Sequence, residues 1–172
     1  ECEVTTVRGT KVSTMVRPLL EPNSDIFLRF NESISIYRKV NSKQEPALSD
    51  LVSSQKPFGF RTFYRGKPSP FPNAVKLYTN SGGQYVDLSG VQQNREWVGK
   101  HKVYISMAYG AGEDFPHQII NKPFYGEPNS CCTETFLVIG PFESSDIAHN
   151  VISYIATRFF RFLVMLRKNT QH

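Results

Sequence analysis

Alternation of apolar and polar residues opens the chain and predicts its first strands. ECEVTTV at 1–7 and KVSTMV at 11–16 alternate on either side of a short RGT turn, which is typical of a β-hairpin. AVKLYTNSGGQYVDL at 74–88 predicts a second hairpin, with glycines placed where its turn needs positive φ. KVYISMA at 102–108 and TETFLVIG at 133–140 predict two more strands, and the continuous LVI run of the latter indicates burial on both faces.

Helical spacing is clearest at the end of the chain. Ser144 or Ser145 can cap a helix in which apolar residues recur at a helical period until about Lys168. These apolar positions predict one long amphipathic helix: Ile147, Val151, Ile155, Phe159, Phe162 and Leu163. A shorter helix is predicted in NESISIYRKV, with Asn31 as its cap, although 33–36 also fits a strand.

The remaining segments predict short or irregular structure. ALSDLVSS at 47–54 fits one or two helical turns, and NREWVGKHK at 94–102 fits a short helix. RTFYRG at 61–66 fits a strand, whereas the three prolines of KPSPFPN at 67–73 exclude regular structure. Together these segments predict an α+β fold: a twisted, mostly antiparallel sheet of short strands with long loops, closed by a long C-terminal amphipathic helix.

Size and composition predict one compact domain. The chain has 172 residues, of which 40% are hydrophobic and 20% are charged, as in ordinary globular proteins. No apolar run approaches the roughly 18 residues of a membrane span, and the first residues lack the pattern of a signal peptide. We therefore expect a cytoplasmic protein. The abrupt start without Met predicts a piece of a longer chain.

Charge is unevenly distributed, which changes this picture. The net charge is only +5, yet no acidic residue lies between Asp50 and Asp87. Aromatic rings alternate there with the cations Lys56, Arg61, Arg65, Lys67 and Lys76. Cations mixed with planar rings suit a polyanion whose bases can be contacted or stacked. A solvated basic face over an aromatic core explains the same pattern.

Three cysteines raise the question of metal or thiol chemistry. Structural zinc sites separate paired cysteines by two to four residues, whereas Cys131 and Cys132 are adjacent and, on an extended chain, point to opposite faces. Their odd number and spacing do not fit a disulfide framework. A nucleophilic cysteine beside His101 or His117 is an alternative, but the sequence favours buried, unreactive thiols.

Motifs of common DNA enzymes are missing from the sequence. YGAGEDF at 109–115 imitates a nucleotide-binding loop, but Pro116 follows directly and no helix pattern appears. No Asp or Glu is followed two residues later by Lys, the pairing used by many metal-dependent nucleases, and there is no Asn-Pro-Pro-aromatic stretch. The sequence thus favours binding over catalysis, although Glu113, Asp114 and Glu134 are acids available to a site.

Three stretches resemble one protein family. RPLLEPNSDIFLRFNESISI at 17–36, KVYISMAYGAGEDFPHQ at 102–118 and the segment 126–172, which begins GEPNSCCTETFLVIGPF, carry the similarity. In this order they resemble the C-terminal, target-recognition portion of adenine-specific DNA methyltransferases of bacterial type II restriction-modification systems, in the Eco and Taq group where the methylase can be fused to an endonuclease. The resemblance implies a single recognition domain over 1–172, excised from a larger enzyme.

In that family a separate catalytic domain carries the S-adenosylmethionine loop and the base-gripping motif. The resemblance therefore implies no cofactor and no catalytic residue in this fragment, with S-adenosylmethionine bound by the parent protein. Its expected partners are double-stranded DNA and the parent's catalytic domain, with no membrane.

A set of ten residues is predicted to contact DNA. Cations would bind phosphates, while polar groups of loops would read base edges. The set comprises Lys56, Arg61, Arg65, Lys67, Lys76, Tyr109, His117, Gln118, Asn129 and Ser130. Two alternative functions remain open: a stand-alone cysteine-dependent hydrolase or transferase, and a protein-interaction module whose aromatic middle packs on a partner.

Overall fold

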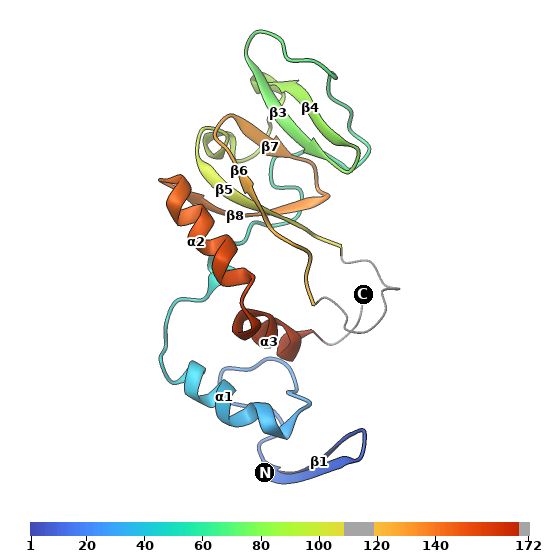
Figure 1. Ribbon diagram of the computed structural model, residues 1–172, viewed down its shortest axis with the longest axis vertical. Coiled ribbons are helices and arrows are strands. Elements are labelled where there is room, and N and C mark those ends of the chain that lie inside the picture. Colours follow the sequence, from blue (N-terminus) through green and yellow to red (C-terminus); the bar gives the residue numbers. More distant parts are fainter. Residues whose placement is uncertain (109–118, 169–172) are drawn as a thin grey trace. The chain divides into compact units, whose positions relative to one another are not determined.

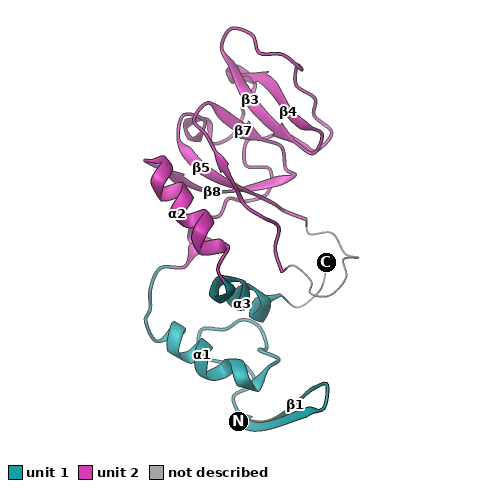
Figure 2. Cartoon of the chain, in the orientation of Figure 1, with its two compact units in different colours: residues 1–46, 158–171 teal, residues 47–157, 172 magenta. Residues whose placement is uncertain are grey.

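The computed structural model describes residues 1–108 and 119–168. The chain divides into two compact units (Figure 2): unit 1 comprises 1–46 and 158–171, and unit 2 comprises 47–157 and 172. Within the described ranges, no helix has the length and apolar character that a membrane crossing requires. The single recognition domain over 1–172 stays a prediction. In the structure, this range divides into the two compact units.

Unit 1 is built from a hairpin and two helices. Strand β1 (Cys2–Arg8) pairs antiparallel with β2 (Lys11–Arg17), as the alternation predicted. Helix α1 (Asn31–Asn41) confirms the helical alternative for this segment over the strand. Leu28, Ile34 and Tyr37 form a small core with Leu166 of helix α3 (Arg158–Arg167), so the two ends of the chain share one apolar cluster.

A buried polar network joins the hairpin to α1. Arg17 is almost fully buried; its Nε donates to Asn31 Oδ1 at 3.0 Å and its Nη2 donates to the Leu28 carbonyl at 2.5 Å. Asn31 Nδ2 donates in turn to the carbonyls of Val4 and Ser13, at 2.8 and 2.9 Å. The prediction that Asn31 caps the helix is wrong: Phe30 holds the cap position, and the Asn31 side chain is committed to the hairpin.

Unit 2 contains two three-stranded sheets (Figure 1). In the first, the order is β4-β3-β7, where β3 (Ala74–Thr79) pairs antiparallel with β4 (Gly82–Asp87) and parallel with β7 (Ser130–Cys132). The second sheet is antiparallel and has the order β6-β5-β8. Its strands are β5 (His101–Ser106), β6 (Phe124–Gly126) and β8 (Phe136–Phe142).

Short helices complete unit 2. Helix α2 (Ser145–Ile155) lies against β5, β6 and β8 and begins with the predicted cap, because Ser144 Oγ accepts from the Ile147 amide at 3.4 Å. The two segments expected to be helical are short 3₁₀ helices, at Leu48–Leu51 and Arg95–Trp97, and a third spans Leu88–Gly90. The α+β class is therefore confirmed, with separate sheets in place of the single predicted sheet.

The predicted long closing helix is wrong. Helix α2 ends at Ile155 in unit 2, and α3 begins at Arg158 in unit 1. Thr157 terminates α2, because both its amide and its hydroxyl donate to the Tyr154 carbonyl, at 3.0 and 2.7 Å. A side-chain hydroxyl that donates a hydrogen bond to a backbone carbonyl in this way competes with the hydrogen bonds that would continue the helix. The apolar period continues through the break because both helices have apolar faces.

RTFYRG is also not a strand. Residues 62 and 63 form a turn, and the rest of 61–66 has no regular structure. On either side of the segment, isolated bridges join Phe60 to Thr133 and Lys67 to Tyr85. Cys131 and Cys132 lie in a short strand of their own, β7, which a turn separates from β8. The proline-rich segment 67–73 lacks helices and strands, as predicted.

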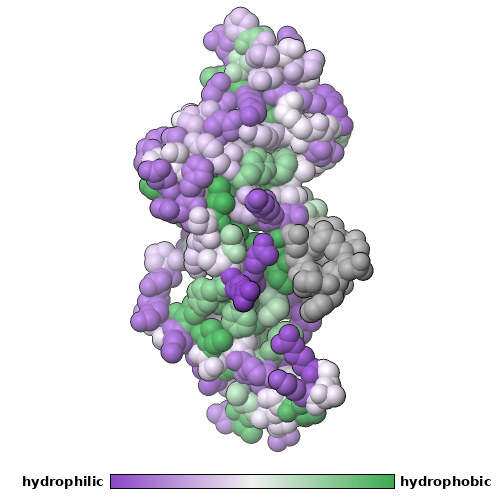
Figure 3. All heavy atoms as spheres, in the orientation of Figure 1, coloured by the Kyte–Doolittle hydropathy of each residue, from purple (hydrophilic) through white to green (hydrophobic). Residues whose placement is uncertain are grey.

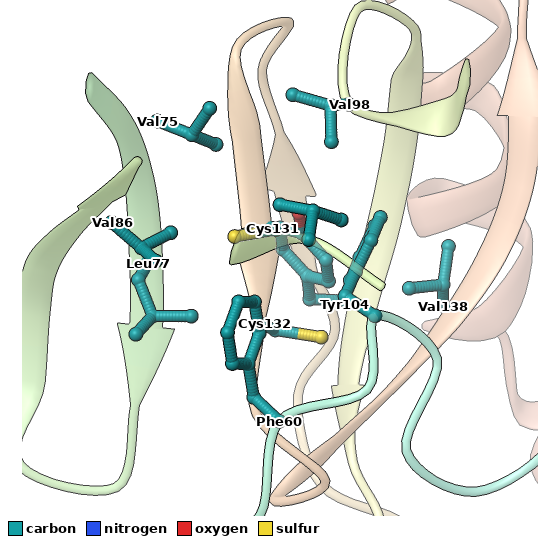
Figure 4. Packing of buried hydrophobic residues seen from close by; sticks show 11 residues of the cluster. Phe60, Val75, Leu77, Val86, Val98, Tyr104, Cys131, Cys132 and Val138 are labelled. Carbon is teal, nitrogen blue, oxygen red and sulfur yellow. The ribbon is translucent and has the colours of Figure 1, made fainter. Parts of the chain in front are cut away.

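The core of unit 2 lies between its two sheets (Figure 4). Leu77 and Val86 of the first sheet face Tyr104 and Val138 of the second, with the cysteines of β7 between them. All of these side chains are at most 4% exposed. Gly126 makes close packing possible at the point where β6 turns toward β7, because a Cβ there would lie 2.6 Å from Tyr104 Cε2 and 2.8 Å from Lys102 Cγ.

Gly126→Ala is expected to destabilise unit 2 by about 1–3 kcal/mol, because its methyl group overlaps two buried side chains. Urea unfolding followed through Trp97, the single tryptophan, which packs against this core, measures the change. Gly99→Ala is the matched control, since a Cβ at Gly99 meets nothing within 4 Å. Equal stability of the two variants would contradict the packing.

Arg17→Leu is expected to destabilise unit 1 by about 3–5 kcal/mol, because Asn31 and the Leu28 carbonyl lose a buried donor and the buried carboxylate of Glu21 loses a cation 3.9 Å away. Hydrogen exchange of the α1 amides measures the effect, and exchange should become faster along the helix. Lys39→Leu, on the exposed side of the same helix, should leave the exchange unchanged. Unaltered α1 protection in the Arg17 variant would show that the network does not hold the helix.

Candidate nucleic-acid interface

Segment 56–67 carries most of the predicted cations, and its aromatic residues fix it to the core. Phe58 and Phe60 are buried, and Tyr64 packs on Phe60 with ring centroids 4.6 Å apart. The cations between these rings reach solvent: Arg61, Arg65 and Lys67 are exposed, and Lys56 is half-buried. The segment thus combines both interpretations of the sequence, because most of its rings form the core while its cations form a surface.

The backbone of this segment is hydrogen-bonded at two places, to the turn that follows β7 and to strand β4. The Glu134 amide donates to the Phe60 carbonyl at 2.9 Å, and Lys67 exchanges two backbone hydrogen bonds with Tyr85, at 2.8 and 2.9 Å. The Gly66 amide donates to Gln84 Oε1 at 2.6 Å. These bonds fix the backbone that carries the cations.

Carboxylates distant in sequence neutralise two of the predicted cations. Arg61 Nη1 lies 3.4 Å from Glu134 Oε2, and Lys76 Nζ lies 2.7 Å from Glu127 Oε1. Hydrogen bonding to Glu127 raises the pKa of Lys76 well above its usual value. The window without acids in the sequence is therefore not free of acids in space, and Lys76 is a poor phosphate ligand.

Arg65 and Lys67 keep their charges available. Arg65 Nη1 donates to the carbonyls of Thr62 and Tyr64, at 3.1 and 3.2 Å, and Lys67 Nζ lies 4.5 Å from the centroid of the Phe71 ring. In the part of the chain that the structure describes, neither forms an ion pair with a carboxylate. Arg61 is intermediate, because an exposed ion pair contributes little to stability and a phosphate can compete for its guanidinium.

Glu134 organises this surface, a role that the sequence did not predict. Its Oε1 accepts from the Thr62 amide at 3.0 Å and from the Thr62 hydroxyl at 3.4 Å. The backbone hydrogen bond from Thr62, with the charges of Arg61 and Lys56 nearby, lowers the pKa of Glu134. The carboxylate therefore stays ionised and holds the turn that follows Arg61.

The polar residues of GEPNS that were predicted to contact DNA form hydrogen bonds within the protein instead. Ser130 is fully buried; its Oγ donates to the Glu127 carbonyl at 2.5 Å and lies 3.0 Å from the Tyr104 hydroxyl, so it cannot contact DNA. Asn129 is exposed, but its Nδ2 donates to the Ala74 carbonyl at 3.0 Å in the turn beside β3. Tyr109, His117 and Gln118 lie outside the described residues.

Glu127 and Lys102 complete this turn. Burial alone would raise the pKa of Glu127, but hydrogen bonds from Lys76, from its own backbone and from Tyr78 together lower it. Lys102 is fully buried, and its Nζ donates to the carbonyls of Val98, Lys100 and Glu127, at 3.3, 2.7 and 3.2 Å. Burial lowers the pKa of Lys102 to about 8. These groups have protein partners and support the fold.

The cysteines are packing residues. Cys131 and Cys132 are both 0% exposed, and their sulfurs point in opposite directions from β7, as adjacent residues of a strand require (Figure 4). Burial raises the pKa of Cys131 to about 12 and also raises that of Cys132 well above its ordinary value. No group of three metal-ligating side chains occurs among the described residues. The hypothesis of an exposed cysteine nucleophile is therefore wrong.

Comparisons with known proteins do not add a relative. No protein-family model, curated protein or solved structure matches the chain.

The burial of the thiols predicts their reactivity. At about pH 9, an ordinary thiol of pKa about 8.5 is mostly ionised, whereas Cys131 stays protonated because its pKa is raised to about 12. In the native protein, iodoacetamide should alkylate Cys2, which is partly exposed, and spare the β7 pair until urea unfolds the chain. Mass spectrometry of peptides from native and unfolded protein measures this; rapid native alkylation of the pair would contradict the packing.

Proposed function

We propose that this chain is a DNA-binding recognition module of a bacterial restriction-modification enzyme, which locates the site for adenine methylation. The observation that carries the proposal is the cationic surface of segment 56–67, defined as Lys56, Arg61, Arg65 and Lys67. Its cations stand on a backbone fixed by hydrogen bonds, and at least two of them lack a carboxylate partner in the described structure. The resemblance of 17–36, 102–118 and 126–172 to recognition portions of adenine methyltransferases supports the same function.

Two further features support binding rather than catalysis by this chain. The thiols are buried and their pKa values are raised, which removes the one nucleophile that the sequence offered. The conspicuous buried base, Lys102, is surrounded by backbone carbonyls. Methyl transfer then belongs to a separate domain of the parent protein in the bacterial cytoplasm, which binds S-adenosylmethionine and receives the extruded adenine.

A second surface favours contact with another protein domain. The outer face of the β1–β2 hairpin carries Val7, Val12 and Val16, each between 63% and 67% exposed, and Leu19 follows at 62%. Green atoms mark apolar residues in the hairpin region of Figure 3. An exposed group of aliphatic side chains on a two-stranded sheet suits a protein partner, and we propose the parent's catalytic domain.

The double variant Arg65→Glu, Lys67→Glu tests DNA binding. Fluorescence anisotropy of a labelled random duplex, at about 50 mM and about 200 mM salt, gives the affinity and its salt dependence. Loss of two phosphate contacts should reduce the slope of log K against log salt by about 2 and lower the affinity at least tenfold.

Lys39→Glu, Lys43→Glu is the matched control, because it makes the same change in net charge at exposed positions of unit 1. If both double variants lose affinity equally, the attraction comes from net charge alone and the assignment to segment 56–67 is wrong. Failure of the wild-type chain to bind duplex at the lower salt would sink the proposed function itself.

A further inference from the structure

Phe63 is the most exposed large hydrophobic side chain that the structure describes. It is 78% exposed, whereas the neighbouring rings of Phe58 and Phe60 are buried and Tyr64 packs on Phe60. Single exposed apolar residues are common on protein surfaces and carry no meaning by themselves. Phe63 differs because of where its backbone is held and which charges lie beside it.

The turn that carries Phe63 is firmly anchored. The Tyr64 amide donates to the Arg61 carbonyl at 3.0 Å, which places Thr62 and Phe63 at the two tip positions of a β-turn. Glu134 fixes the Thr62 amide at 3.0 Å, and the Tyr64 ring fixes the far side by packing on Phe60. An aromatic ring thus projects from a rigid backbone, so little chain entropy is lost when it enters a binding partner.

Two arginines bracket the tip of this turn in the sequence. Arg61 precedes the tip and is held by Glu134, and Arg65 follows it and folds back onto the carbonyls of Thr62 and Tyr64. The Arg61 side chain is 60% exposed, and Arg65 is exposed as well. An apolar ring between cations matches the alternation of stacked bases and phosphates along a nucleic-acid strand.

We propose that Phe63 inserts into the base stack of bound duplex DNA, while Arg61 and Arg65 contact the phosphates on either side. This inference rests on the proposed DNA-binding function and adds its mode: the chain unstacks a base step as well as holding the backbone. Insertion of an apolar side chain partly unstacks the step and kinks the duplex. A neighbouring base is then easier to extrude, which is the task that adenine methylation requires.

The charges around the tip favour DNA over a pocket on a protein partner. A protein hot spot for a lone Phe is a desolvated apolar pocket, and two flanking guanidinium groups must then also be desolvated or paired. Phosphates supply those partners directly and in bidentate geometry. The carboxylate that the structure places at the turn, Glu134, is already occupied by Thr62 and Arg61.

The test uses the full chain and short duplexes that contain 2-aminopurine, whose fluorescence rises when it is unstacked. Binding of the wild-type chain should raise the fluorescence, and Phe63→Ala should abolish this rise and weaken binding about tenfold, without changing the salt slope. Phe63→Leu, which keeps an apolar wedge, should retain part of the fluorescence rise. Trp97 emission checks that each variant is folded.

The outcomes separate this inference from the proposed function. If the wild-type chain binds duplex with the expected salt slope but 2-aminopurine fluorescence stays constant, DNA binding stands and insertion is wrong. The same conclusion follows if Phe63→Ala matches the wild type in both affinity and fluorescence, which is also the result expected of a pocket on a protein partner. If no duplex is bound at all, both proposals fail.

Discussion

The turn from Gly126 to Ser130 is the constraint on which unit 2 depends, because it carries the chain from one sheet to the other. Strand β6 ends in the second sheet and β7 begins in the first, so the residues between them must satisfy both. The Glu127 carboxylate accepts hydrogen bonds from Lys76 and Tyr78 of β3, and the Glu127 carbonyl accepts one from Lys102 of β5. The backbone of Asn129 accepts from the Lys76 amide and donates to the Val98 carbonyl, at 3.0 and 2.7 Å.

Once this turn is fixed, the position of the candidate interface follows. It sets β7 beside β3, which buries both cysteines and leaves the end of β7 free to receive Phe60. Glu134 then lies directly beyond β7, where its carboxylate meets Thr62 and Arg61. The position of the cationic surface therefore depends on how β7 packs in the core. In this arrangement the residues of GEPNS support the fold and help to place the segment that carries the cations.

Local pattern was sufficient to predict most strands, since both hairpins, β5 and β8 follow from alternation or apolar runs. Pairings between distant segments were not predictable in the same way. The parallel contact of β3 with β7 and the carboxylate partners of Arg61 and Lys76 depend on residues about 50 or more positions away. The division of the C-terminal helix was missed because the period of apolar residues continues across the break. A single threonine, Thr157, ends the first helix by donating a hydrogen bond to a backbone carbonyl of that helix.

Exposure of Phe63 has the same origin as the absence of the strand that was predicted at 61–66. A strand there would have placed Arg61, Phe63 and Arg65 in a row along one face of a sheet, whereas the observed turn puts Phe63 at its tip. Instead, the Glu134 carboxylate accepts a hydrogen bond from the Thr62 amide, and the chain turns at this point. Since the ion pair with Arg61 is exposed and weak, phosphate can replace it without loosening the turn, because the Thr62 hydrogen bonds to Glu134 are separate from it. One carboxylate thereby fixes the backbone of the tip and leaves its guanidinium exchangeable.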